Sequence, residues 1–148
     1  MILVLWGYGF DEIAASIFVA ELRRAGKRVK LVGLNSQQIA GQHGVILFPD
    51  LLLGQALRAA NRIQCIIVPA PLAALKQFSH DPRLAELLGL ATSQNALVVA
   101  NASPAVEHDL SHTSLPVFPL HRLLPYPSPE ELMGFVQNVL VPRLMGGT

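Results

Sequence analysis

Short runs of consecutive apolar residues recur along the chain at the length of β-strands. The clearest are residues 2–6, 63–68 and 96–100. Because these runs do not alternate with polar residues, they are typical of strands that are covered on both faces, as in a parallel sheet. Residues 27–33 predict a further strand, and residues 45–48 predict a small strand or an extended arm.

Residues 11–25 have the pattern of a helix between the first two strands. Asp11 and Glu12 stand at its start, where carboxylates interact favourably with the helix dipole, and Gly26 stands where a terminating residue is expected. A strand, a helix and a strand in this order form a βαβ unit, and its crossover is expected to be right-handed.

The second half of the chain contains further helix signals. Asp81-Pro82 has the form of an N-cap followed by proline, and Ser128-Pro129 followed by two glutamates has the form of a capping box. We expect the last helix to end at Pro142, and the proline-rich residues 115–129 to be extended and irregular. Together these elements predict one α/β domain over residues 1–148, a flavodoxin-like three-layer sandwich with a mainly parallel sheet.

Composition narrows the class of protein. Apolar residues make up 51% of the chain and charged residues 14%, which excludes an intrinsically disordered protein. A net charge of +1 excludes nucleic-acid binding through overall charge, and the basic residues between 23 and 30 are explained by a helix end and solvated loop charges.

No apolar stretch reaches the ~18 residues that a membrane span needs. A single cysteine cannot form an internal disulfide, so we expect a reducing, cytoplasmic setting.

Several short motifs occur in the first half of the chain: Gly9-Phe10-Asp11-Glu12-Ile13, Leu22-Arg23-Arg24-Ala25-Gly26, Gly41-Gln42-His43-Gly44-Val45, Phe48-Pro49-Asp50 and Ile66-Ile67-Val68-Pro69. Together they resemble the ThiJ/PfpI superfamily, whose fold is related to that of class I glutamine amidotransferases. The resemblance is good over residues 1–69, weaker but alignable through Pro104, and poor beyond that residue.

The resemblance implies a site with three chemical parts. A cysteine on a turn after a strand is the nucleophile, an acid from the first helix hydrogen-bonds its thiol, and backbone N–H groups after the third strand stabilise an oxyanion. In this sequence the matching positions hold Asn101, Ala14 and Pro71, and Phe118 matches a histidine often found beside the thiol. Proline has no N–H to donate, and a side-chain amide does not replace a thiolate nucleophile.

These departures predict a catalytically silent protein that acts as an oligomeric binding or interaction module, with no cofactor and no bound metal. The vestigial pocket is expected to be lined by Ala14, Ala70, Pro71, Asn101 and Ser103. The sequence does not identify its small-molecule ligand.

The alternative is an enzyme whose chemistry has been rebuilt without the cysteine, of the hydratase or lyase type. Asp11, Glu12 or Asn101 would carry that chemistry. Asp11 and Glu12 are therefore either polar residues of the pocket or only capping residues of the helix.

Other features have structural explanations beside functional ones. Cys65 lies in mid-strand and is expected to be a buried core thiol. Gly7-Tyr8-Gly9 before a helix is similar to the start of a dinucleotide fingerprint, but Glu12 stands where that fingerprint has a small residue. His108 and His112 have the spacing of two metal ligands on one helical turn, but no third ligand is near in the sequence.

The helix predicted over residues 11–25 has more apolar surface than one contact with a sheet needs. Ala15, Val19 and Ala20 extend its apolar character beyond the ~100° stripe that would face the sheet. Small residues on this surface would allow another helix to approach closely. We therefore expect a homodimer that is built partly on this helix.

Overall fold

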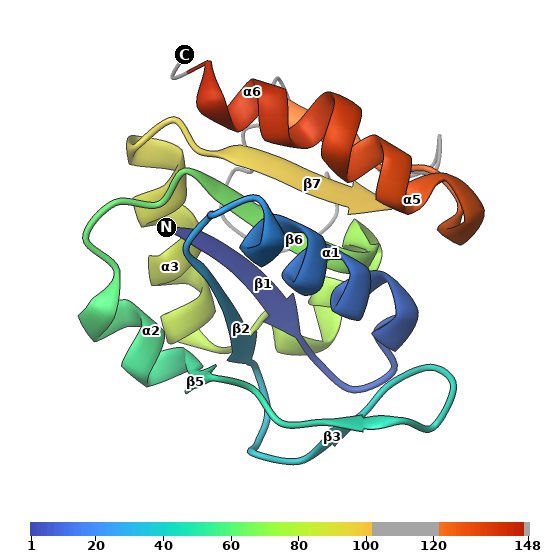
Figure 1. Cartoon of the computed structure of the whole chain (residues 1–148). Helices are drawn as coiled ribbons and strands as arrows, with labels where there is room; N and C mark the ends of the chain where they lie inside the picture. Colours follow the sequence, from blue (N-terminus) through green and yellow to red (C-terminus); the bar gives the residue numbers. More distant parts are fainter. Residues whose placement is uncertain (102–121, 147–148) are drawn as a thin grey trace.

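In the computed structural model, which describes residues 1–101 and 122–146, a parallel sheet lies between two layers of helices (Figure 1). The six strands have the order β5-β2-β1-β6-β7-β8, and each neighbouring pair is parallel. The strands are β1 (Ile2–Trp6), β2 (Val29–Gly33), β5 (Leu51–Leu52), β6 (Cys65–Pro71), β7 (Leu97–Asn101) and β8 (Leu123–Pro125). The flavodoxin-like α/β class predicted from the apolar runs is confirmed.

β1 lies inside the sheet because its residues are all apolar and can be covered from both sides. Each of its side chains is fully buried. Val4 pairs with Leu31 of β2 on one side and with Ile67 of β6 on the other. Such a continuous apolar run is what a central parallel strand requires.

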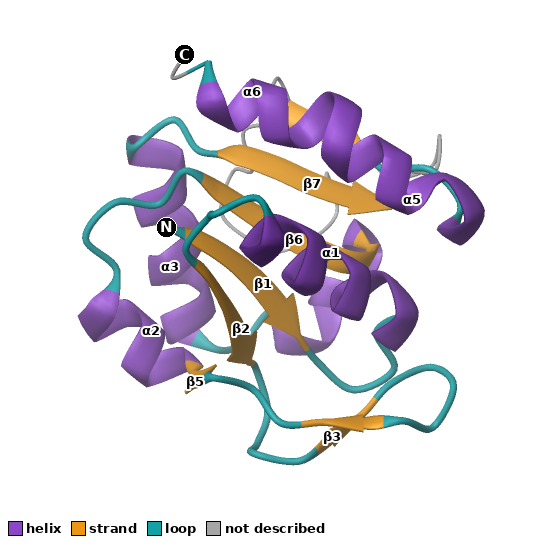
Figure 2. Ribbon diagram, viewed as in Figure 1, coloured by secondary structure: helices purple, strands orange, loops and turns teal. Residues whose placement is uncertain are grey.

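Two groups of helices cover the two faces of the sheet (Figure 2). On one face α1 (Glu12–Arg24) contacts a C-terminal helical run, made of α5 (Pro129–Phe135), the π-helical turn η3 (Val136–Leu140) and α6 (Val141–Met145). On the other face α2 (Leu53–Ala59) contacts α3 (Pro82–Ser93). Among the described residues, no helix has the length and apolar character to cross a membrane.

The C-terminal helical run differs from the prediction at both ends. Ser128 is its N-cap residue, but no side-chain hydrogen bond caps the helix, so the predicted capping box is wrong. Pro142 does not end the helix, because α6 continues to Met145. Proline has no N–H for the usual helical hydrogen bond. The π-helical turn before Pro142 shifts the hydrogen-bonding pattern, so the helix continues beyond this proline.

The edge strands β5 and β8 and the 3-10 turn η1 (Leu72–Phe78) were not predicted. Strands of two and three residues are too short to leave a periodic pattern. β8 lies inside the stretch 115–129 that was expected to be irregular, and this expectation is wrong for residues 123–125. Residues 102–121 lie outside the described part of the chain.

A small arm projects beside the carboxyl ends of the parallel strands (Figure 1). It consists of β3 (Ile39–Ala40) and β4 (Ile46–Leu47), which pair antiparallel, and the turn between them. Gly44 in this turn has a φ of +83°, which glycine adopts without strain, and its N–H donates to the Gly41 oxygen at 3.0 Å. The prediction of a small strand or arm at residues 45–48 is confirmed.

The side chain of Asp50 connects the last turn of α1 to β2. Its Oδ2 accepts hydrogen bonds from Arg23 Nη2 at 2.7 Å and from the Leu31 N–H at 2.8 Å. Arg23 also donates to the Val29 oxygen at 3.0 Å. Among the basic residues between 23 and 30, Arg23 therefore has a structural role.

Candidate functional site

The carboxyl ends of β6 and β7 bring together residues predicted for the vestigial pocket. β7 ends at Asn101, which pairs in register with Pro71 at the end of β6. Ala70 precedes Pro71 and is buried, and Ala14 is buried on the first turn of α1. At these four positions the chain presents a single polar side chain, the amide of Asn101.

Three sequence expectations fall outside the part of the chain that the structure describes. They concern Ser103 in the predicted pocket, the absence of a metal at His108 and His112 despite their spacing, and Phe118 in place of a histidine. These expectations remain predictions from the sequence.

The end of β1 is enclosed by aromatic side chains. Phe10 makes edge-to-face contacts with Trp6 and with Phe78, and each pair of ring centroids is 6.3 Å apart. A Cβ atom on Gly7 would lie 2.7 Å from Phe78 Cζ, so the close approach of Phe78 requires glycine there. The Gly9 N–H donates to the Ala40 oxygen at 3.1 Å. The Gly7-Tyr8-Gly9 segment thus serves packing and contact with the arm, which argues against dinucleotide binding.

Cys65 is the first residue of β6 and lies between β1 and β7 in the sheet. It pairs with Ile2 and with Leu97, and its side chain is fully buried. Burial raises the pKa of the Cys65 thiol well above its ordinary value. The interpretation of Cys65 as a core thiol is confirmed.

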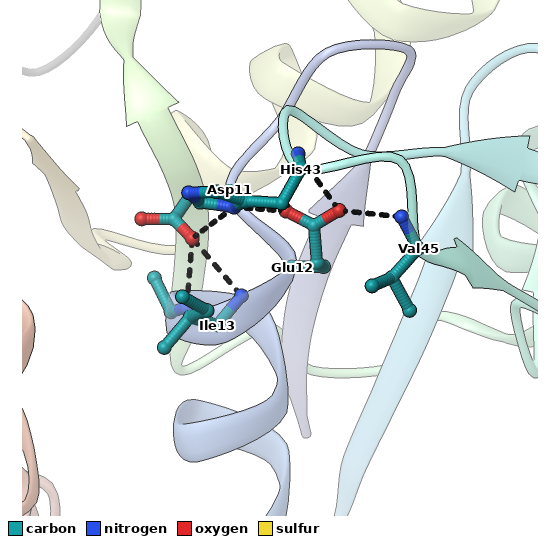
Figure 3. A network of polar contacts seen from close by, with 6 residues as sticks. Asp11, Glu12, Ile13, His43 and Val45 are labelled. Carbon is teal, nitrogen blue, oxygen red and sulfur yellow. Dashed lines mark hydrogen bonds and ion pairs between the residues drawn. The ribbon is translucent and has the colours of Figure 1, made fainter.

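Asp11 is the N-cap of α1 (Figure 3). Its Oδ1 accepts hydrogen bonds from the Ile13 N–H at 2.9 Å and from the Ala14 N–H at 3.3 Å. These are donors of the first helical turn that would otherwise lack a partner inside the helix. The capping interpretation is thus confirmed for Asp11.

Glu12 does not cap the helix but reaches across to the arm (Figure 3). Its carboxylate accepts the N–H groups of His43 and Val45, each at 3.0 Å, and the His43 ring nitrogen Nδ1 lies 2.6 Å from Oε1. Only 3% of Glu12 is exposed. A Cβ atom on Gly41 would lie 2.5 Å from Glu12 Oε2, so the carboxylate fits only because residue 41 is glycine.

The Glu12 carboxyl group is held in its ionised form. Burial by itself raises its pKa, but hydrogen bonds from its own backbone, from the His43 ring and N–H, and from the Val45 N–H together lower that pKa below the ordinary value. An ionised carboxylate only accepts hydrogen bonds, so the His43 ring donates from Nδ1.

Ligand atoms of Asp11, Glu12 and His43 lie within 4.8 Å of one another, as they would around a metal ion. The chemistry of this group does not fit a cation. Two backbone N–H groups point at the Glu12 oxygens, and a cation placed there would face their positive hydrogens. The cluster is a structural network that fixes the arm to α1.

Sequence reasoning found no role for His43 and did not connect it with Glu12. The two residues are 31 positions apart, and nothing in the spacing indicates their contact. The signal that was present is the short Gly41-Gln42-His43-Gly44 segment, whose two glycines permit a tight turn and a close approach.

Comparison with known proteins agrees with the fold. The model of the family described as the DJ-1/PfpI family matches residues 1–104. Similar solved structures include oxidized DJ-1 of Toxoplasma gondii, with a TM-score of 0.72 and 19% identity over 96% of this chain and 89% of that chain. DJ-1beta of Drosophila melanogaster has a TM-score of 0.72 and 19% identity, covering 99% and 95% of the two chains. A mutant DJ-1 superfamily protein of Salmonella typhimurium has a TM-score of 0.75 and 17% identity, covering 98% and 90%. No curated protein sequence matches this chain.

Proposed function

This chain belongs to the DJ-1/PfpI family, and we propose that it is a catalytically silent member that acts as an oligomeric binding or interaction module. The observation that carries the proposal is the complete burial of Cys65, the only cysteine of the chain. A cysteine nucleophile must be accessible and must have a lowered pKa, whereas burial raises the pKa of Cys65. Cysteine chemistry therefore has no reactive thiolate in the folded protein.

The residues at the carboxyl ends of the strands support the same proposal. Asn101 offers an amide, Ala14 has no acidic group, and Pro71 has no N–H with which to stabilise an oxyanion. The mechanism that the family resemblance implies needs a different chemical group at each of these three positions, and none of the three residues supplies it. Loss of one oxyanion donor costs about 10²–10³ in rate, and loss of a nucleophile costs about 10⁶.

The alternative of a rebuilt enzyme has less support from the acidic residues. A general base needs a free lone pair within reach of a substrate proton. Both oxygens of Glu12 accept hydrogen bonds from the arm, and Asp11 Oδ1 accepts two helix N–H groups, which leaves Asp11 Oδ2 as the oxygen of these two carboxylates that accepts no hydrogen bond among the described residues. Asn101 is the one predicted pocket residue among the described ones that is both polar and exposed.

Exposed apolar side chains support the oligomeric part of the proposal. They lie on and around the arm and the start of α1, and they are Tyr8, Ile13, Val45, Ile46 and Phe48. We assign this apolar surface to contact with a second copy of the chain, since burying large exposed apolar side chains favours association.

The predicted reason for dimerisation through α1 needs correction. Ala15 was expected to contribute free apolar surface, but it is fully buried within the chain, because α5 and η3 also contact α1. Val19 is partly buried against the core, and of the three predicted residues only Ala20 is exposed. The apolar surface proposed for the dimer therefore shifts from the middle of α1 to its first turn and the arm.

Turnover assays with dicarbonyls, amides and nitriles test whether the protein is silent. We expect no turnover by the wild type above a protein-free control. Turnover that persists in Cys65→Ala and disappears in Asn101→Ala would overturn the proposal in favour of rebuilt chemistry. Turnover lost in Cys65→Ala would overturn it in favour of cysteine chemistry.

A further inference from the structure

A cavity of about 230 Å³ lies at the amino ends of β6, β7 and β8. This is the opposite end of the sheet from Asn101 and the arm, near the end of α6 in Figure 1. Its lining residues come from the segments before these strands, from the first residue of β7 and from α6: Arg62, Ile63, Gln64, Gln94, Asn95, Leu97, Arg122, Arg143 and Leu144. We call it the arginine pocket.

The charged residues known to line the arginine pocket are all basic. Arg62, Arg122 and Arg143 line it, and among residues 1–101 and 122–146 no acidic residue does. These are three of the 11 basic residues in a chain whose net charge is only +1. Within the part of the chain that the structure describes, none of the ion pairs involves these arginines. Because the three arginines line the same cavity, an anion placed there would interact favourably with all three charges.

Arg122 adds a second observation. Its Nε atom is buried and, within the described residues, has no hydrogen-bond partner. A buried donor of a charged group without a partner destabilises a protein, so such groups are almost always satisfied in native structures. The Nε atom itself has almost no accessible surface, so what Arg122 offers a ligand in the pocket is the charge of its guanidinium group.

The wall of the arginine pocket is built by hydrogen bonds between separate segments. Gln94 Oε1 accepts the Ile63 N–H at 2.6 Å, and the Gln64 oxygen accepts the Leu97 N–H at 2.9 Å. Because Gln94 Oε1 already accepts the Ile63 N–H, the Gln94 amide can offer a ligand its NH₂ group as a donor. Ile63 and Leu97 are buried, so the base of the pocket is apolar.

We propose that the arginine pocket binds a small phosphate-bearing anion. A guanidinium donates two parallel hydrogen bonds to phosphate oxygens, and three guanidinium groups match a dianion better than a single carboxylate. The volume of about 230 Å³ is below that of pockets for drug-sized ligands, which favours inorganic phosphate or a short phosphate monoester over a nucleotide. This site does not depend on the proposed dimer, since the arm and the pocket lie at opposite ends of the sheet.

Calorimetric titration of the full chain at constant ionic strength tests this proposal. The probes are inorganic phosphate, glycerol 3-phosphate, malonate and a short single-stranded oligonucleotide. The variants are Arg143→Gln and Arg122→Gln, and the matched control is Arg58→Gln, which removes the same charge from an exposed position on α2. Arg143 is exposed, so its variant tests the site even where Arg122→Gln does not fold.

We expect saturable binding of at least one phosphate probe by the wild type. Its affinity should fall by at least about tenfold in the two pocket variants and should be unchanged in Arg58→Gln. Equal affinity for both phosphate probes indicates free phosphate as the ligand, and tighter binding of glycerol 3-phosphate indicates a phosphate monoester. The proposal is overturned by absent binding, by equal weakening in Arg58→Gln, or by tighter binding of malonate or of the oligonucleotide.

Discussion

At the scale of single residues, Glu12 has the most specific environment in the described part of the chain. It is the most buried charged side chain there, and its hydrogen bonds come from the arm rather than from its own helix. Gly41 leaves the space that its carboxylate fills. A buried carboxylate of this kind stabilises a protein only while every acceptor position is used.

We predict that Glu12→Gln lowers the free energy of unfolding at pH 7 by about 2–3 kcal/mol, because an amide places an NH₂ group against N–H donors. The folded-state pKa of Glu12 is lowered, so its stabilising effect is present above the ordinary carboxyl pKa of 4.5 and is lost as the pH falls toward the folded value. The difference between wild type and variant should therefore shrink below about pH 5. Urea unfolding at a series of pH values measures it.

The matched control for this prediction is Glu86→Gln, which makes the same change at an exposed position on α3. It should shift the free energy of unfolding by less than about 0.5 kcal/mol. A Glu12→Gln variant that is as stable as this control at pH 7 would show that the network around Glu12 contributes nothing.

At the scale of elements, the arm is fixed to the start of α1 by backbone contacts as well as by Glu12. The Gln42 N–H donates to the Phe10 oxygen at 2.7 Å, and the Gly9 N–H donates to the Ala40 oxygen. Ile46 on the arm and Phe48 directly after it are nonetheless left on the surface, at 53% and 66% exposure. A rigid element that presents large apolar side chains is suited to a contact between subunits.

We predict that Ile46→Glu shifts the protein from dimer to monomer in sedimentation velocity while its circular dichroism stays that of the wild type. A charge placed in an apolar interface loses hydration without gaining a partner, whereas on an exposed strand of a monomer it costs little. Met145→Glu is the control, since Met145 is 70% exposed at the far end of the chain on α6. It should remain a dimer.

Two results would contradict the assignment of the arm to the dimer. One is a wild type that sediments as a monomer at micromolar concentration. The other is an Ile46→Glu variant that remains as dimeric as Met145→Glu. A charge at Val19 is a weaker test, because Val19 packs partly against the core and a charge there would also disturb the fold.

At the scale of the whole molecule, the pattern of apolar runs was sufficient to predict the central sheet and its class. β1, β6 and β7 are long apolar segments, so burial on both faces follows from their composition. The pattern did not predict β5, β8 or the passage of the last helix over Pro142. These features depend on pairing with a neighbouring strand or on a local π turn, neither of which leaves a periodic signal.

The sequence identified the residues of the candidate site less completely than it identified the fold. The cap by Asp11 follows from its position before a helix, and the burial of Cys65 follows from its apolar neighbours. The contact of Glu12 with His43 and the convergence of Arg62, Arg122 and Arg143 could not be predicted. They join segments that are distant along the chain and meet only when the sheet has formed.

The central claim is that the only cysteine of this chain takes no part in chemistry, and alkylation of Cys65 tests it most directly. The rate of labelling by iodoacetamide is measured in the native protein and in denaturant, with Ser16→Cys on the exposed side of α1 as a reactive control. We predict that native Cys65 is labelled at least about a thousandfold more slowly than in denaturant, because only the rare unfolded molecules expose it. Rapid stoichiometric labelling of Cys65 in the folded protein would contradict the account.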